Sequence, residues 1–342
     1  MTDAVLVLSH LSVDFAVEED RVSAVTDVSL SVARGEIFGL VGESGCGKST
    51  LALAIMGLLP RTARVRGQIA FEGRELIGLG ERELRALRGD RISMVFQDPL
   101  TSLDPTFGVG EQVAETVEAH RAVTRDQART RALQLMNEVG IPASEHRYAE
   151  PPHRFSGGMR QRVVVATALA NDPALLLADE PTTALDVTIQ AQILDLLAEL
   201  KERLGMAIML ITHAMGVVAE VAQRVVVMYA GQVVEEASVE ELFAHPRHPY
   251  TQGLIRSIPR IDTAALQKVR LEQIPGTVPK LIDPAEGCRF AARCKYAVAA
   301  CIDATPALRE PVPGHKVRCI LDVFPAAPAL VIPSEAKDLS LP

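Results

Sequence analysis

The chain has 342 residues, of which 48% are hydrophobic and 4% aromatic, and its formal net charge is −8. This length allows one large or two modest domains with an ample core, and the acidic balance argues against a protein held mainly by nucleic-acid phosphates. The longest apolar candidate for a membrane span, residues 163–178, is interrupted by Asn171, Asp172 and Pro173, so no span is expected. The first residues lack the basic region and cleavage site of a secretory signal, which predicts a cytosolic chain whose five cysteines are not paired in disulfides.

Residues 4–33 alternate apolar and polar positions in short runs, which predicts a region of antiparallel strands. Phe15 lies in this region. It could stack on an adenine base, or it could be a core residue that shares one strand face with Leu11 and Val13. Both interpretations stay open at this point.

Residues 42–50 match the phosphate-binding pattern G-x-x-x-x-G-K-[ST] at every fixed position. An apolar run of buried-strand type precedes the motif and a helix-forming run follows it, so several backbone N–H groups would point at one anion. Lys48 would reach the β- and γ-phosphates, and Ser49 would ligate Mg²⁺. Cys46 lies beside Lys48 and a helix N-terminus, which favours a reactive thiolate, and a small space-filling side chain is the alternative. The predicted phosphate-binding residues are Gly42, Ser44, Gly45, Cys46, Gly47, Lys48, Ser49 and Thr50.

The next segments indicate a strand pair at 67–76, a short helix at 81–88 and a strand at 91–96 that ends at Gln97. Open parallel sheets place their ligands at such strand ends, so the Gln97 amide is a candidate for contact with Mg²⁺ or water. From residue 99 the pattern becomes helical and charged, which predicts a helical insertion into the nucleotide-binding domain.

Ser156, Gly157 and Gly158 open an apolar helix that runs to residue 170. Ser156 is a good N-cap, and the glycines expose backbone N–H groups, so the segment is a second phosphate-binding device. A buried strand at 174–178 then ends in Asp179 and Glu180. Asp179 would hold Mg²⁺, and Glu180 would polarise the attacking water as a general base.

A helix at 188–204 and a buried strand at 207–211 follow, and that strand ends at His213, a candidate sensor of the γ-phosphate. Residues 225–229 and 232–235 indicate a β-hairpin. After residue 260 we expect no further sheet, because prolines and turns replace the strand pattern.

Taken together, the chain resembles an ATP-binding-cassette (ABC) ATPase. The resemblance covers about residues 4–258, and its motifs appear in the family's order. It implies an α/β fold with a parallel-sheet core, an antiparallel β subdomain and a helical subdomain at about 99–170. It also implies ATP and Mg²⁺ as cofactors and head-to-tail pairing with a second ATPase subunit, the same or different. Ser156, Gly157 and Gly158 would then contact ATP on the partner's phosphate loop, and Asp186 would cross the dimer interface. The residues that carry the resemblance are those of the loop 42–50, Gln97, the stretch 156–161, Asp179, Glu180, the segment 184–186 and His213.

A narrower resemblance is to the oligopeptide/dipeptide importer ATPases, and it rests on residues 158–162, 181–192 and 245–251. It implies ATP hydrolysis coupled to peptide uptake at the cytoplasmic face of the membrane, through two permease subunits and indirectly an extracytoplasmic solute-binding protein. Some relatives serve nickel, glutathione or saccharide systems. A soluble ABC ATPase without a transport role and a metal-sensing regulator are the alternatives. Two positions depart from the family pattern: Phe155 stands in place of Leu, and Ala214 in place of Asp.

The predicted domains are an ATPase domain at 1–258, a C-terminal extension at 259–324 and a disordered tail at 325–342. The extension contains Cys288, Cys294, Cys301 and Cys319, spaced C-x5-C-x6-C-x17-C. Four cysteines in a region with few core residues suggest a closed metal site. The spacing lacks the short C-x2-C pairs of structural zinc, which favours a [4Fe–4S] cluster over zinc and leaves free thiols third. The importer ATPases that the chain resembles point the same way.

Overall fold

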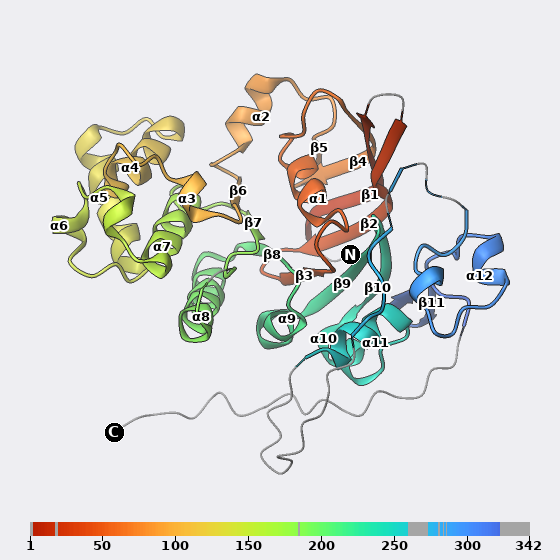
Figure 1. Ribbon diagram of the computed structural model, residues 1–342. Coiled ribbons are helices and arrows are strands. Elements are labelled where there is room, and N and C mark those ends of the chain that lie inside the picture. The colour runs from red at the N-terminus through yellow and green to blue at the C-terminus, as the bar shows by residue number, and fades with distance from the viewer. Residues whose placement is uncertain are drawn as a thin grey trace, which may run out of the picture.

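The computed structural model describes residues 3–17, 20–183, 185–258, 273–279, 281–282, 284 and 286–321. A mixed eight-stranded sheet forms its centre (Figure 1). The strands are β3 (Ile37–Val41), β6 (Ile92–Val95), β7 (Leu175–Asp179), β8 (Ala207–Thr212), β9 (Arg224–Tyr229), β10 (Gln232–Ser238), β11 (Arg309–Val312) and β12 (His315–Val317). Their spatial order is β11-β12-β10-β9-β3-β8-β7-β6.

The middle of this sheet is parallel. β3 pairs with β8 and β9, β8 with β7, and β7 with β6, all in parallel register. Every residue of β3, β6, β7 and β8 is buried, as expected for parallel strands that are covered on both faces. The carboxyl ends of these four strands therefore meet at one edge, which confirms the parallel-sheet core predicted from the sequence.

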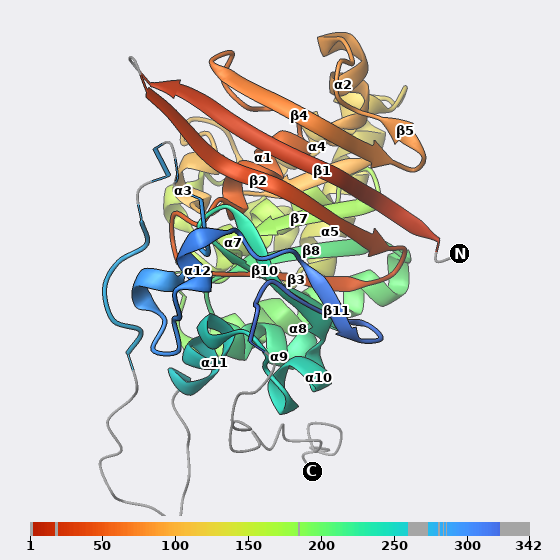
Figure 2. The same cartoon turned by 90° about the vertical axis from the view of Figure 1, so that its right-hand side faces the viewer.

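A second, four-stranded antiparallel sheet lies beside the first, in the order β2-β1-β4-β5 (Figure 2). Helix α1 (Lys48–Ile55) contacts β1, β2 and β7, so it lies between the two sheets. Its buried residues and the facing strands share one apolar cluster. The antiparallel strands, which confirm the predicted β subdomain, are β1 (Ala4–Val17), β2 (Asp20–Ala33), β4 (Ala63–Phe71) and β5 (Arg74–Glu75).

A group of helices lies on one side of the molecule, in the part of the chain where the sequence predicts a helical insertion (Figure 1). It comprises α3 (Pro99–Ser102), α4 (Val109–His120), α5 (Arg125–Glu138), α6 (Ser144–Arg147), η1 (Pro152–Arg154) and α7 (Gly157–Ala168). Phe155 is buried in the core of this group, with the Arg147 guanidinium 5.6 Å from its ring centroid. The phenyl ring is therefore accommodated where the family usually has leucine.

The remaining helices connect and cover the strands. α2 (Glu81–Leu87) follows the antiparallel sheet, and the other helices lie around the central sheet and the C-terminal extension (Figures 1 and 2). They are α8 (Val187–Leu204), α9 (Met215–Val221), α10 (Val239–Ala244), α11 (Pro249–Arg256), η2 (Ala291–Arg293) and α12 (Ala300–Asp303).

The expectation that no sheet follows residue 260 is wrong. β12 pairs antiparallel with β10, Glu235 opposite Val317, and β11 pairs with β12. β11 has four residues and is mostly exposed, and β12 has only three residues. Neither strand is long enough to show the apolar alternation by which a strand is predicted from the sequence. They pair because β10 offers a free edge, and ion pairs such as Lys316–Glu236 (3.0 Å) join them to it. The domain boundary at 258 stays a prediction, and the predicted tail at 325–342 lies outside the described residues.

Candidate functional site

The phosphate loop joins β3 to α1 in a conformation that requires glycine. Gly47 has φ 101°, and a Cβ there would lie 2.4 Å from the carbonyl oxygen of Ala24. A Cβ on Gly42 would lie 2.2 Å from the carbonyl oxygen of Met228. The buried Lys48 ammonium donates hydrogen bonds to the carbonyl oxygens of Gly42 (2.7 Å) and Glu43 (3.1 Å). The loop is thus held closely against its neighbours, with the ammonium group inside it.

A cavity of about 470 Å³ adjoins the loop. It brings together residues that the sequence places far apart, including Gln97 from the end of β6 and Glu180 from the end of β7. On the loop side it is lined by Ser44, Gly45, Gly47, Lys48, Ser49 and Thr50.

Asp179, the last residue of β7 and the neighbour of Glu180, is 5% exposed. Burial raises the pKa of its carboxyl group, a hydrogen bond with Ser49 opposes that effect, and the charge of Glu180 adds to it. Its Oδ1 atom has no hydrogen-bond partner in the described part of the chain. A buried carboxylate oxygen without a partner, next to the Ser49 hydroxyl, fits a bound Mg²⁺ ion.

Glu180 is held by three side chains. His213 Nδ1 lies 3.0 Å from Oε1, while Gln97 Nε2 (3.1 Å) and Thr183 Oγ1 (2.8 Å) donate to Oε2. Burial alone would raise the pKa of Glu180, but the hydrogen bonds from His213 and Thr183 outweigh it and leave the pKa below its ordinary value. Glu180 also has a left-handed backbone with φ 48°, which is uncommon outside glycine and is frequent at functional sites. The carboxylate is therefore ionised and fixed in direction.

The residues predicted to act on a partner's nucleotide lie outside this cavity. Ser156 caps α7, accepting a hydrogen bond from the backbone N–H of Met159 (3.3 Å), and Asp186 caps α8 in the same way through Ile189 (2.9 Å). A Cβ on Gly158 would lie 2.6 Å from Ile189 Cγ2, so the two segments pack against each other. Ser156, Gly157 and Asp186 are exposed. Ala184 lies outside the described residues.

Phe15 is partly buried against the core cluster around α1. It stands directly opposite Val22 in the β1–β2 register, and Val22 lines the cavity. The structure thus places Phe15 next to the cavity wall, and its contact with an adenine base stays a prediction.

The expected thiolate at Cys46 is wrong. Its side chain is completely buried in the core cluster around α1, and this burial raises the pKa of the thiol although Lys48 opposes the shift. The sequence shows that Lys48 and a helix N-terminus are near, but it does not show that the thiol points into the core.

The structure gives no direct support for the metal site expected at the four C-terminal cysteines. Cys288 and Cys294 are half-buried, Cys301 and Cys319 are buried, and all are free thiols. Within the described ranges, no three His, Cys, Asp or Glu side chains are arranged to hold a metal ion. Burial raises the pKa of Cys319 to about 11, which favours the protonated thiol. The four thiols nevertheless lie close enough together to interact electrostatically, so the metal centre stays a prediction.

The C-terminal half makes two contacts with the phosphate loop that no sequence motif predicts. The backbone N–H of Glu43 donates to the hydroxyl oxygen of Tyr250 (2.8 Å). Arg293 donates to the Glu43 carboxylate through Nη1 (2.7 Å) and Nη2 (3.1 Å). Glu43 occupies a variable position of the motif, so nothing in the pattern indicated a partner so distant in sequence.

A phosphate loop that faces an ordered glutamate at parallel strand ends, together with a helical subdomain that carries a capped S-G-G segment, defines a P-loop ATPase of the ATP-binding-cassette type. Comparison with known families agrees with this class. A family model described as "ABC transporter" matches residues 25–183, and one described as "Oligopeptide/dipeptide transporter, C-terminal region" matches residues 234–301.

Curated relatives are similar over nearly the whole chain. A probable peptide ABC transporter ATP-binding protein of Sinorhizobium fredii is 52% identical over 93% of this chain and 95% of its own length. A dipeptide transport ATP-binding protein of Lactococcus lactis is 47% identical over 97% and 95%. An oligopeptide transport ATP-binding protein of Bacillus subtilis is 46% identical over 97% and 92%.

Among solved structures, the dimeric ATP-binding cassette MJ0796, in a post-hydrolysis state with ADP and Pi, is 30% identical with a TM-score of 0.62. The match covers 68% of this chain and 98% of that one. The chain belongs to the ABC transporter family, as an ATP-binding, ATP-hydrolysing subunit that uses ATP and Mg²⁺. In the part of the chain that the structure describes, none of the helices has the length and apolar character needed to cross a membrane.

Proposed function

We propose that this protein is the ATP-hydrolysing subunit of an importer for di- and oligopeptides. The names of its relatives and the match over residues 234–301 support this substrate class. The proposal of ATP hydrolysis rests on the fixed Glu180 carboxylate, which lines one cavity together with Lys48 and Ser49. Nickel, glutathione and saccharides are the alternative solutes.

The polar residues at and around the cavity have distinct tasks in this proposal. Lys48 and the loop N–H groups bind the β- and γ-phosphates, and Ser49, Asp179 and Gln97 hold the metal. Mg²⁺, when bound, neutralises negative charge on the phosphates. Glu180 orients a water molecule and accepts its proton. His213, hydrogen-bonded to Glu180, fixes the direction of that carboxylate and faces the γ-phosphate.

Hydrolysis also requires a second ATPase subunit in this proposal. Ser156, Gly157, Gly158 and Asp186 lie outside the cavity of their own chain, and most of them are exposed. They are therefore placed to act on a nucleotide held by a partner subunit. The dimeric state named for MJ0796 supports such a pairing.

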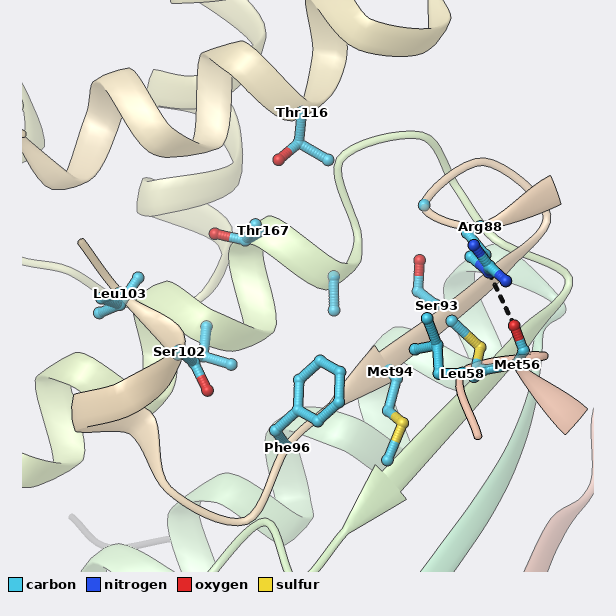
Figure 3. A pocket seen from close by; sticks show the side chains of 13 residues that line it. Met56, Leu58, Arg88, Ser93, Met94, Phe96, Ser102, Leu103, Thr116 and Thr167 are labelled. Carbon is cyan, nitrogen blue, oxygen red and sulfur yellow. Dashed lines mark hydrogen bonds between the residues drawn. The ribbon is translucent and has the colours of Figure 1, made fainter. Parts of the chain in front are cut away.

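A groove of about 290 Å³ between β6 and the helical subdomain supports the docking of a permease (Figure 3). Met94 and Phe96 line it from the β6 side, and Leu103 and Thr167 line it from the helices. Phe96 is 41% exposed and Leu100, at the adjoining α3, is 61% exposed. Because Gln97 follows Phe96 directly, an apolar permease segment in this groove would sense the state of the ATP site. Such docking would hold the protein at the cytoplasmic face of the membrane, with a solute-binding protein acting only through the permeases.

We further propose a division into an ATPase domain at 1–258, with its helical subdomain at 99–170, and an extension at 259–324. We also propose a [4Fe–4S] centre on the four neighbouring cysteines, with zinc as the alternative, and no step of the mechanism depends on it. Iron and zinc analysis of anaerobically purified protein tests this centre directly.

The experiment that tests the function uses the protein co-expressed with its two permease subunits and reconstituted in vesicles. ATP-dependent uptake of a labelled dipeptide is expected, with no uptake of nickel, glutathione or saccharide. Leu100→Ser should reduce co-purification with the permeases while the ATPase fold is kept. The control is Ile302→Ser, an exposed residue of α12, which lies on the opposite side of the molecule from α3 and should have no such effect. An active ATPase that never co-purifies with permeases would favour a role outside transport.

A further inference from the structure

Part of the C-terminal extension reaches the nucleotide cavity. Val278, Pro279 and Leu281 line the same cavity as Lys48 and Glu180. We call residues 273–279, 281 and 282 the C-terminal strap. It runs along the edge of β2, where Val22 and Ile282 form an antiparallel bridge and the backbone N–H of Ser23 donates to the carbonyl oxygen of Leu281 (2.9 Å).

One buried side chain ties the strap to the phosphate loop. Arg293 Nε donates to the carbonyl oxygen of Pro275 in the strap (2.8 Å), while the rest of its guanidinium group binds the Glu43 carboxylate in the loop. The Arg293 side chain is 7% exposed and lies 5.6 Å from the Tyr229 ring centroid. Bidentate guanidinium–carboxylate pairs are geometrically specific, so the strap is fixed relative to the loop and does not merely lie beside it.

The two sides of the cavity differ in chemistry. The loop side offers backbone N–H groups, hydroxyls and the Lys48 ammonium, which suit phosphates. Apart from Gln97 and Glu180, the other lining residues offer hydrocarbon surface, from Val22 and Ala24 in β2 and from Val278, Pro279 and Leu281 in the strap. A nucleotide has a matching pair of ends, with charged phosphates at one end and a flat base of low polarity at the other.

We propose that the C-terminal strap forms part of the base-binding wall of the nucleotide site, with Val278, Pro279 and Leu281 contacting the adenine base. Arg293 is a positioning residue that sets this wall at a fixed place relative to the phosphates. The assignment rests on the ATP site proposed above, and it gives the extension a direct role in nucleotide affinity. The C-terminal extension, which a cassette without it would lack, thus forms part of the nucleotide site.

The test compares two ligands, Mg·ATP and Mg-tripolyphosphate, by calorimetric titration of the full-length protein. Val278→Ala removes two methyl groups from the wall and should raise the Kd for ATP by about fivefold to tenfold, while the Kd for tripolyphosphate, which has no base, stays unchanged. Val298→Ala, an exposed valine of the same extension outside this cavity, is the matched control and should change neither value. Equal loss of both ligands in Val278→Ala, or no change in either, would overturn the proposal.

A photolabelling experiment keeps the proposal testable if Val278→Ala unfolds. Ultraviolet irradiation with 8-azido-ATP should attach the label to the peptide that contains residues 274–282, and excess ATP should prevent it. Arg293→Ala should shift the label away from this peptide, because the wall loses its anchor. A label found only outside the strap in the unaltered protein would overturn the proposal.

The Lys48→Ala variant distinguishes a failure of the proposed ATP site from a failure of the proposed strap contact. If this variant binds tripolyphosphate normally, the phosphate site itself is misassigned, whatever the result for the strap.

Discussion

His213 Nδ1 lies 3.0 Å from Oε1 of Glu180, across the carboxyl ends of the adjacent strands β7 and β8. The Glu180 side chain is 11% exposed, whereas the His213 side chain is 57% exposed. Glu180 is therefore held at the strand end by His213, whose own side chain stays largely exposed. A largely buried, ionised carboxylate with a fixed direction is what a general base for water requires.

The first prediction concerns Glu180→Gln. The amide cannot accept a proton from water, so ATP turnover should fall by about 10²–10⁴-fold, while ATP binding is retained because Lys48 and the loop are unchanged. Steady-state phosphate release and nucleotide titration measure the two effects. Glu199→Gln, an exposed glutamate on α8, is the matched control and should leave both unchanged. Near-normal turnover in Glu180→Gln would refute the assignment of the base.

The second prediction separates the two phosphate-binding devices. Lys48→Ala removes the buried ammonium from the loop, so the monomer should lose productive ATP binding. Ser156→Arg alters an exposed helix cap that lies outside the cavity, so the monomer should bind ATP normally but fail to hydrolyse it as a dimer. Titration of ATP at protein concentrations that keep the protein monomeric checks the first effect, and turnover against protein concentration checks the second. Equal loss of affinity in both monomers would show that Ser156 does not act across a dimer.

Much of this site was predictable because its motifs follow buried strands. Each of Gln97, Asp179 and His213 lies at the end of an apolar run that can be recognised in the sequence. Parallel strands bring their carboxyl ends together, so these residues were expected to meet. What the sequence could not show is which distant segments meet there. Arg293 contacts Glu43 across 250 positions, and the strap reaches the cavity through a bridge to β2 rather than through any motif of its own. Strands β11 and β12 were missed for the same reason, since their pairing depends on the edge of β10.

The third prediction corrects the chemistry expected of Cys46. Its thiol is completely buried and its pKa is raised, so it should react slowly with iodoacetamide in the folded protein and rapidly after denaturation. Mass spectrometry of the peptide that contains Cys46 measures both rates. Cys294 is half-buried and provides the internal reference, because it should be labelled first. Fast labelling of Cys46 in the native state, with protection by Mg·ATP, would restore the thiolate predicted from the sequence.

The last prediction concerns pH and the attachment of β12 to the core. His315 is completely buried, with Nε2 2.7 Å from Glu235 Oε1 and Nδ1 3.1 Å from Glu241 Oε1. Burial lowers the pKa of His315, but its hydrogen bonds with Glu235 and Glu241 outweigh burial and the opposing charge of Arg247, so the pKa is raised. His245 also contacts Glu241, at 3.0 Å, and competes for that carboxylate.

Because the folded state binds the proton of His315 more tightly than the unfolded chain does, this contribution to stability is fully present below the ordinary histidine pKa of about 6.5. It is lost as the pH rises through the raised pKa of the folded state. The difference in melting temperature between the unaltered protein and His315→Gln should therefore be larger at pH 6 than at pH 9. His245→Gln is the control, because its exposed side chain should give a smaller difference at both values. A difference that is independent of pH would mean that His315 is neutral in the folded protein and that Glu235 and Glu241 hold it without a charge.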